Sequence, residues 1–174
     1  MNQINYEEMK KQEHIDYIKA VKVFDKILGA KKYAAKYRQM PLGSPSDMRF
    51  NFEQRYFNVE IKSRNQDMDK YPQLQLKLSK LKRLALDTKD FEKLLYVVLV
   101  NDTDYYIYDL ENIDFSSTPH VEYDEENIDF SNLVFTDWTI NKVQYAVDGE
   151  TEIETVPTYF IPISMACAYG KIPR

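Results

Sequence analysis

The apolar run at residues 94–100 constrains the fold more than any other part of the sequence. It reads Leu-Leu-Tyr-Val-Val-Leu-Val, with no charged residue to mark a solvated face. A run of this length and β-branched content is typical of a strand buried on both faces. The turn-forming residues 101–104 follow at once, and residues 105–108 are expected to form the antiparallel neighbour. The sequence therefore predicts a sheet whose central strand is covered on both sides.

Segments with helical periodicity accompany this strand. Apolar residues recur at helical spacing from about residue 6 to residue 28, and Gly29 is expected to end that helix. A second, shorter helix is expected at residues 31–39. Residues 74–78 alternate like a strand and continue as a basic helix, with Ser79 near its N-cap. At 174 residues, the chain has the size of one domain that mixes helices and strands, an α/β domain.

Two alternating segments predict a β-hairpin. They are residues 48–52 and 56–62, with the turn at residues 53–55. Side chains of a strand alternate between its two faces, so Glu60 and Lys62 share the polar face of the second segment. The hairpin therefore presents a carboxylate and an ammonium side by side.

Asp47 stands at the mouth of the first predicted strand, next to the segment Glu60-Ile61-Lys62. Magnesium prefers carboxylate and carbonyl oxygens in octahedral geometry and keeps several waters. Phosphodiester hydrolysis needs a cation that neutralises the phosphate and activates a water, together with a group that positions that water. Two carboxylates from neighbouring strands, a backbone carbonyl and an adjacent lysine meet these needs.

This pattern resembles the motif of the PD-(D/E)xK nucleases, which include restriction endonucleases, Holliday-junction resolvases and phage exonucleases. Asp47 is followed by twelve residues and then by Glu60-Ile61-Lys62, a spacing common in that family. The resemblance implies a restriction-endonuclease-like α/β fold with three layers, in which helices flank a central mixed β-sheet. It implies that Asp47, Glu60 and the carbonyl of Ile61 bind Mg²⁺, with Mn²⁺ as the alternative. It also implies that Lys62 orients the attacking water.

The resemblance points to further residues around this motif. Many family members place a supporting glutamate on the first helix, where Glu13 is the first candidate and Asp16 the second. Members also carry a helix whose Gln or Lys side chains reach the substrate backbone. The available residues of that kind are Gln73, Gln75, Lys80 and Lys82. DNA is the implied partner, and a homodimer is one implied assembly, since many single-domain members act as dimers.

Charge is divided unevenly along the chain. Residues 1–100 hold 20 Lys and Arg against 13 Asp and Glu, a balance of +7, whereas residues 101–174 hold 3 against 15, a balance of −12. A phosphate-bearing partner is attracted to the first part and repelled by the second. We expect a single domain over residues 1–174, with a core at about 6–110 and an acidic peripheral part at about 111–174. That part contains a near-duplicate, since residues 108–116 and 123–131 are identical at all but one position.

Several kinds of protein and site are disfavoured. No apolar run reaches the roughly 18–20 residues needed to span a bilayer, and the N-terminus is polar and charged, so a cytoplasmic protein without a membrane partner is expected. Cys167, His14 and His120 lack the spacing of a zinc site, and Cys167 is expected to be a small core residue. The tyrosines at residues 105–108 are expected to cover a sheet edge rather than stack on bases.

Three functions fit these patterns. The first is a magnesium-dependent endo- or exodeoxyribonuclease, and the second is the same fold without catalysis, acting as a nucleic-acid-binding or assembly module. The third makes the acidic second part a protein-interaction module or phosphate mimic. The plainest alternative to a site is that Glu60 and Lys62 are only an exposed pair on an edge strand, worth at most a few tenths of a kcal/mol.

Overall fold

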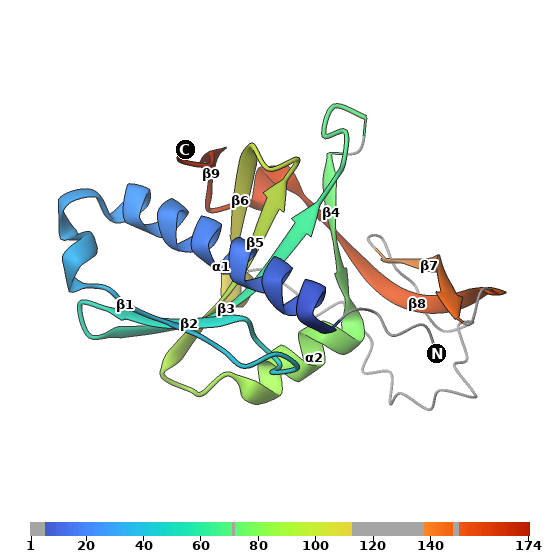
Figure 1. The fold of residues 1–174 in the computed structure, drawn as a ribbon, viewed down its shortest axis with the longest axis horizontal. Helices are drawn as coiled ribbons and strands as arrows, with labels where there is room; N and C mark the ends of the chain where they lie inside the picture. The colour runs from blue at the N-terminus through green and yellow to red at the C-terminus, as the bar shows by residue number, and fades with distance from the viewer. Residues whose placement is uncertain (1–5, 71, 113–137, 148–149) are drawn as a thin grey trace.

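A mixed sheet of six strands runs through the computed structural model, which describes residues 6–70, 72–112, 138–147 and 150–174 (Figure 1). The strands, in their spatial order, are β1 (Lys36–Gln39), β2 (Met48–Phe52), β3 (Arg55–Arg64), β5 (Glu92–Val100), β6 (Asp104–Asp109) and β9 (Ala168–Lys171). β3 and β5 run parallel, and the other neighbouring pairs of this sheet are antiparallel. The predicted hairpin of β2 and β3 and the predicted pairing of β5 with β6 are both confirmed.

β5 is covered on both faces, as its apolar run predicts. One face joins a cluster with α1 (Tyr6–Leu28), and the other joins a cluster with α2 (Leu78–Asp87) and β4 (Gln73–Lys77). Leu95, Val97 and Leu99 face α1, whereas Leu94, Tyr96, Val98 and Val100 face the opposite layer. Each of these side chains is at most 7% exposed. β5 is thus the strand around which the two layers are built.

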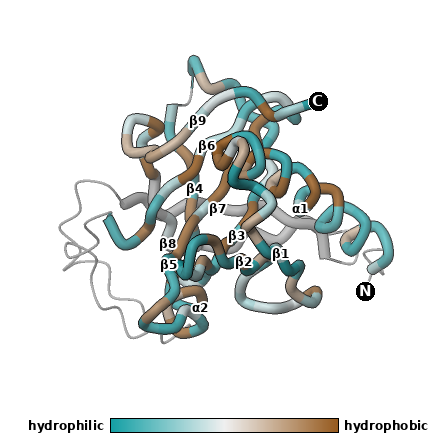
Figure 2. Tube along the Cα trace, turned by 90° about the vertical axis from the view of Figure 1, so that its left-hand side faces the viewer, coloured by the Kyte–Doolittle hydropathy of each residue, from teal (hydrophilic) through white to brown (hydrophobic). Residues whose placement is uncertain are grey.

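α1 lies across one face of the sheet and has the bounds that its periodicity predicts (Figure 1). Hydrophobic and hydrophilic stretches alternate along the helix, as Figure 2 shows. Its buried residues are Ala20, Val23 and Phe24, and the Phe24 ring lies 4.7 Å from that of Phe50 on β2. Gly29 has a φ of 58°, a left-handed conformation that ends the helix at low cost.

The prediction of a helix at residues 31–39 is wrong. A 3-10 helix occupies Gly29–Ala34, and the chain then becomes the edge strand β1. Tyr37 explains the change, because its ring packs 5.4 Å from Phe50 and its hydroxyl donates to Asp25 Oδ1 at 3.0 Å. Pairing with β2 and this packing outweigh a weak local helix propensity.

The second layer consists of α2 and a three-stranded sheet. The order of that sheet is β4, β8 (Glu150–Pro162) and β7 (Trp138–Val147). Short 3-10 helices at Leu110–Asn112 and Ile163–Met165 complete the described elements. The fold class is therefore confirmed as α/β, with a central mixed sheet flanked by helices.

Several local expectations are corrected. Residues 138–147 and 150–162, in the part expected to be acidic and peripheral, are strands, and β9 lies at the edge of the central sheet. Ser79 lies inside α2, whose N-cap is Lys77 without a side-chain cap. Cys167 is exposed rather than in the core.

The remaining expectations concern the tyrosines of β6, the acidic repeat and membrane-spanning helices. Tyr105 and Tyr108 are buried within the sheet layers, and Tyr106 stacks on Tyr169 at 6.3 Å. The second acidic copy, at residues 123–131, lies outside the described residues. None of the described helices combines the length and apolarity needed to cross a membrane.

Candidate functional site

The site begins where β3 continues beyond β2. The last β2–β3 pair is Met48 with Val59, whereas β3 stays paired with β5 as far as Arg64. Among the described strands, none pairs with residues 60–64 of β3 on the β2 side, so this edge is open. A strand edge without a partner exposes backbone N–H and C=O groups, which need other hydrogen-bonding groups.

Asp47 occupies the start of this open edge. Its backbone N–H donates to the carbonyl of Val59 at 3.0 Å, and its Oδ2 accepts from the N–H of Ile61 at 2.7 Å. The N–H and C=O of one strand residue point to the same edge, so the carbonyl of Ile61 also faces this side. The hairpin register thus places one carboxylate and one carbonyl at the same edge.

A pocket of about 390 Å³ opens beside this edge. It is lined by Met9, Gln12, Glu13, Asp16, Asp47, Glu60, Ile61, Lys62, Ser63 and Lys80. These residues come from α1, from the residue before β2, from β3 and from the first turn of α2. Segments far apart in the sequence therefore contribute charged side chains to one hollow.

The remaining predicted residues lie elsewhere. Gln73 and Gln75 line a neighbouring pocket of about 540 Å³ together with Lys70. Lys82 lies on α2 and lines neither of these two pockets. The second pocket holds one Lys and one Asp among amide side chains, so it is less charged than the first.

Glu60 is buried, with an exposed fraction of 6%, which contradicts the alternative of an exposed surface pair. Burial first, and then the nearby Asp47, raise the pKa of its carboxyl to about 8, although Lys80 acts in the opposite direction. Lys80 Nζ lies 2.8 Å from Glu60 Oε2. The ammonium of Lys80 is thus a charged neighbour of this buried oxygen. A buried carboxylate with a second carboxylate nearby is costly, and a bound cation could relieve that cost.

Glu13 and Asp16 bring two more carboxylates from α1. Burial first, and then the charge of Asp47, raise the pKa of Glu13, which places Glu13 within electrostatic reach of Asp47. Asp16 accepts a hydrogen bond from Gln12 Nε2 at 2.9 Å. Of the two candidates, Glu13 is therefore the one that senses the charge of Asp47.

Lys62 provides a cation on the same strand face as Glu60. Desolvation first, and then the neighbouring Arg64, lower the pKa of its ammonium, while Glu60 and Asp47 act in the opposite direction. The side chain is nevertheless exposed, so solvent limits the effect. An ammonium that reaches both the pocket and the solvent can hold a water or a phosphate oxygen.

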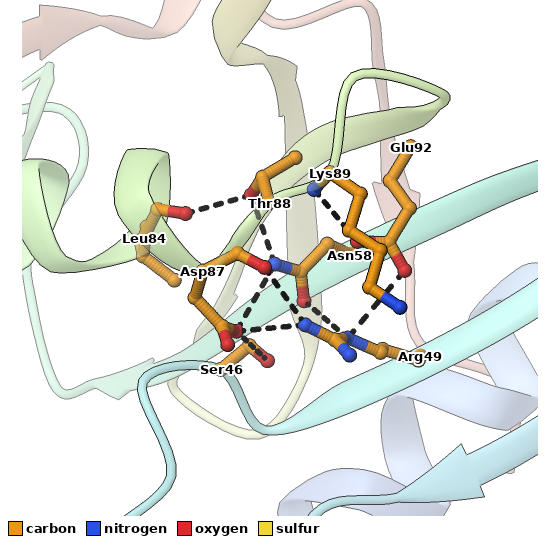
Figure 3. Close-up of polar contacts among 8 residues, drawn as sticks. All are labelled: Ser46, Arg49, Asn58, Leu84, Asp87, Thr88, Lys89 and Glu92. Atoms are coloured by element: carbon orange, nitrogen blue, oxygen red, sulfur yellow. Dashed lines mark hydrogen bonds and ion pairs between the residues drawn. The ribbon is translucent and has the colours of Figure 1, made fainter.

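A polar network that the motif does not predict holds α2 against the hairpin (Figure 3). Arg49 Nη2 lies 3.0 Å from Asp87 Oδ2 and donates to the backbone carbonyl of Asp87 at 2.9 Å. Asn58 Nδ2 donates to Thr88 Oγ1 at 2.9 Å, and Ser46 Oγ donates to Asp87 Oδ2 at 3.2 Å. The network thus joins the residue before Asp47 and the strand of Glu60 to the C-terminal end of α2.

Little in the sequence points to this network. Asn58 lies two residues before Glu60 on the same polar face, so its polarity could have been noticed. Asp87 and Thr88 lie 29 and 30 residues after Asn58, and no local pattern links them to it. Their role comes from the way α2 packs.

The donor set fits a hard divalent cation. Asp47, Glu60 and the carbonyl of Ile61 offer oxygen ligands, and the Glu60 side chain is buried. In the described ranges, no group of three or more His, Cys, Asp or Glu side chains is arranged to hold a metal. A cation here would rest on two carboxylates, one carbonyl and waters, a set that suits magnesium better than zinc.

Comparison with known proteins adds one structural likeness. No protein-family model and no curated protein matches the sequence. Among solved structures, the chain is similar to Hjc, a Holliday junction resolvase from Archaeoglobus fulgidus. The likeness covers 49% of this chain and 74% of that chain, with 13% identity and a TM-score of 0.37. At this level of similarity, only the residues of this chain can support a function.

Proposed function

We propose that this chain is a divalent-metal-dependent nuclease-like protein that hydrolyses phosphodiester bonds in DNA. One observation carries the proposal: Asp47, Glu60, the Ile61 backbone and Lys62 line the same pocket at an open strand edge. The burial of Glu60 adds weight, because a carboxylate that belonged only to a surface pair would stay in solvent, whereas Glu60 is 6% exposed.

Each residue has a defined role in this proposal. Asp47, Glu60 and the Ile61 carbonyl would hold Mg²⁺ or Mn²⁺, supported by Glu13. The bound cation would neutralise the phosphate and lower the pKa of a water. Lys62 would donate a hydrogen bond that orients the attacking water. Asp47 keeps its position through the bond to the Ile61 N–H, so the two carboxylates are preorganised by the backbone.

Substrate binding would use the cations and amides next to the pocket. Lys80 and Lys82 on α2 and Gln73 and Gln75 on β4 are the predicted contacts with the DNA backbone. Because phosphate contacts position a nucleic acid without reading its sequence, these residues give no base preference. A homodimer and a cytoplasmic location remain predictions.

Cleavage of plasmid DNA in Mg²⁺ tests the proposal. We expect activity in the wild-type protein and a loss of about 100-fold or more in Glu60→Gln and in Lys62→Ala, since each removes one preorganised charge. Glu7→Gln and Lys22→Ala alter exposed residues of α1 outside the pocket and serve as matched controls. Equal cleavage by both site variants would show that the activity belongs to another protein in the preparation.

A non-catalytic DNA-binding module is the second candidate. The balance of +7 in residues 1–100, from 20 Lys and Arg against 13 Asp and Glu, favours it. Salt-sensitive binding to DNA with no cleavage in Mg²⁺, Mn²⁺ or Ca²⁺ would select this function over the first. The acidic interaction module depends on residues 113–137, which lie outside the described residues, and it remains a prediction.

A further inference from the structure

Lys80 occupies an unusual position for a lysine. It is the third residue of α2, a helix with no acidic residue in its first turn. The positive end of the helix dipole disfavours a cation there. The side chain instead reaches out of the helix to Glu60, with 2.8 Å between Nζ and Oε2, and it is 26% exposed. The electrostatic environment of Glu60 therefore compensates for the position of Lys80 on the helix.

The atom that Lys80 contacts is the one that a metal would need. Glu60 Oε2 is buried, and the Lys80 ammonium lies 2.8 Å from it. A divalent cation bound to this oxygen at the usual 2.0–2.1 Å for magnesium would lie within a few ångströms of the ammonium. Two positive charges at such a short separation repel strongly in a partly desolvated pocket.

The Lys80 ammonium can leave Glu60 without a movement of α2. Leu78 and Leu84 fix the helix in the core with exposed fractions of 2% and 0%. At its C-terminal end, the helix is held by the contacts of Asp87 with Arg49 (Figure 3). The stem of Lys80 is long and flexible, and the side chain is 26% exposed, so rotation of the side chain alone can vacate Oε2.

We propose that Lys80 is a displaceable counter-ion that occupies the metal's place on Glu60 and leaves when a divalent cation binds. The inference rests on the proposed metal site. Competition with the ammonium weakens metal binding, and the helix keeps the released ammonium at the rim of the pocket. Lys80 is thus a residue that tunes metal affinity by acting on Glu60.

Metal titration of Lys80→Met tests this inference. The substitution keeps a long apolar stem and removes the charge. We expect Mn²⁺ and Mg²⁺ to bind at least about fivefold more tightly to Lys80→Met than to the wild-type protein in isothermal titration calorimetry, because a charged competitor is gone. Lys77→Met, an exposed lysine just before α2, is the control and should leave the affinity unchanged.

The outcomes separate the inference from the proposed function. Unchanged or weaker metal binding by Lys80→Met, with normal binding by the wild-type protein, would overturn the counter-ion role and leave the metal site standing. Absence of metal binding in the wild-type protein would overturn both.

A second measurement needs no substitution, so it holds even if the variant fails to fold. NMR of the lysine ammonium groups in the wild-type protein should show the Lys80 signal shifting on saturation with Mg²⁺. A Lys80 signal that stays constant at full metal occupancy would contradict displacement.

Discussion

At the residue scale, Glu60 is the most buried of the charged residues that line the candidate pocket. Its exposed fraction is 6%, and Asp47 and Glu13 stand nearby, so its charge is expensive in the absence of a cation. The Lys80 ammonium on α2 offsets this cost only in part, because the pKa of the Glu60 carboxyl stays raised. Glu60 is therefore better suited to binding a cation than to stabilising the strand.

This raised pKa predicts how stability depends on pH without metal. The folded carboxyl has a pKa of about 8 against an ordinary value of 4.5, so between these values the folded state holds a proton that the unfolded state has lost. Stability contributed by the proton is present at pH 4.5 and is lost as pH rises towards 8, by up to a few kcal/mol. Urea unfolding in EDTA at pH 5.5 and 8.5 should show this decline.

Glu60→Gln should remove that decline, because an amide does not titrate. Glu7→Gln, at an exposed position on α1, should keep the wild-type slope. A Glu60→Gln protein whose stability falls with pH as steeply as the wild type would assign the slope to other groups.

Asp47 combines two tasks that substitutions can separate. Its Oδ2 accepts the Ile61 N–H at 2.7 Å, and an asparagine oxygen can accept the same bond. We expect Asp47→Asn to change the free energy of unfolding by less than about 1 kcal/mol, and Asp47→Ala to lose about 1–2 kcal/mol more. Both variants should bind Mn²⁺ weakly in calorimetry. Tight metal binding by Asp47→Asn would remove this carboxylate from the site.

At the element scale, the position of α2 depends on a few polar contacts with the hairpin. Arg49 contacts Asp87 at 3.0 Å and lies 3.6 Å from Glu92, whose exposed fraction is 7%. Asn58, with an exposed fraction of 0%, fills the space between them (Figure 3). These contacts set the distance between α2, which carries Lys80, and β3, which carries Glu60.

Removing Arg49 should therefore affect both stability and the site. Arg49→Met leaves two carboxylates without their cation, so we expect a loss of about 2–3 kcal/mol in urea unfolding. Arg38→Met is the matched control, since Arg38 is exposed and lies directly opposite Arg49 in the β1–β2 register. Similar losses in the two variants would show that the network adds little to the packing of α2.

The hairpin turn contains two residues in a strained, left-handed backbone conformation. Glu53 and Gln54 have φ angles of 47° and 66°, the two left-handed positions of a tight turn that favours Asn-Gly. Gln54→Gly should stabilise the protein by about 0.5–1 kcal/mol, because glycine adopts this conformation without strain. A thermal unfolding scan measures the change. Gln39→Gly, inside β1, should have the opposite sign, and the reverse order of the two variants would contradict the turn assignment.

At the scale of the whole molecule, the distribution of charge along the chain differs from what the net charge of −5 suggests. Lys and Arg are concentrated in residues 1–100, which also hold every residue that lines the candidate site pocket. An acidic protein can attract DNA only if such a basic region faces it.

Salt dependence should reveal this arrangement. Fluorescence anisotropy with labelled DNA in EDTA should show affinity falling about tenfold or more between 50 and 200 mM salt, as expected for a few phosphate contacts. Replacing Lys80 and Lys82 by Gln should flatten the slope. Replacing Lys31 and Lys36, which are exposed at the far edge of the sheet, should not. A slope that depends equally on both sets would place the DNA on another surface.

The sequence by itself determined the elements whose signals are local. Helical spacing gave α1 its bounds, alternation gave the hairpin, and the apolar run of β5 required two covering layers. Alternation also put Glu60 and Lys62 on one face, because side-chain direction in a strand depends only on position along it.

The tertiary structure alone decided burial and neighbourhood. Only the packing of α1 and α2 brings Glu13 and Lys80 to Glu60 and buries that carboxylate. Only long-range pairing turns residues 36–39 into β1. The same kind of pairing, at β9, leaves Cys167 exposed beside the edge strand. The reason is physical: periodicity in a chain specifies which way a side chain points, whereas its charge state depends on segments distant in sequence that surround it.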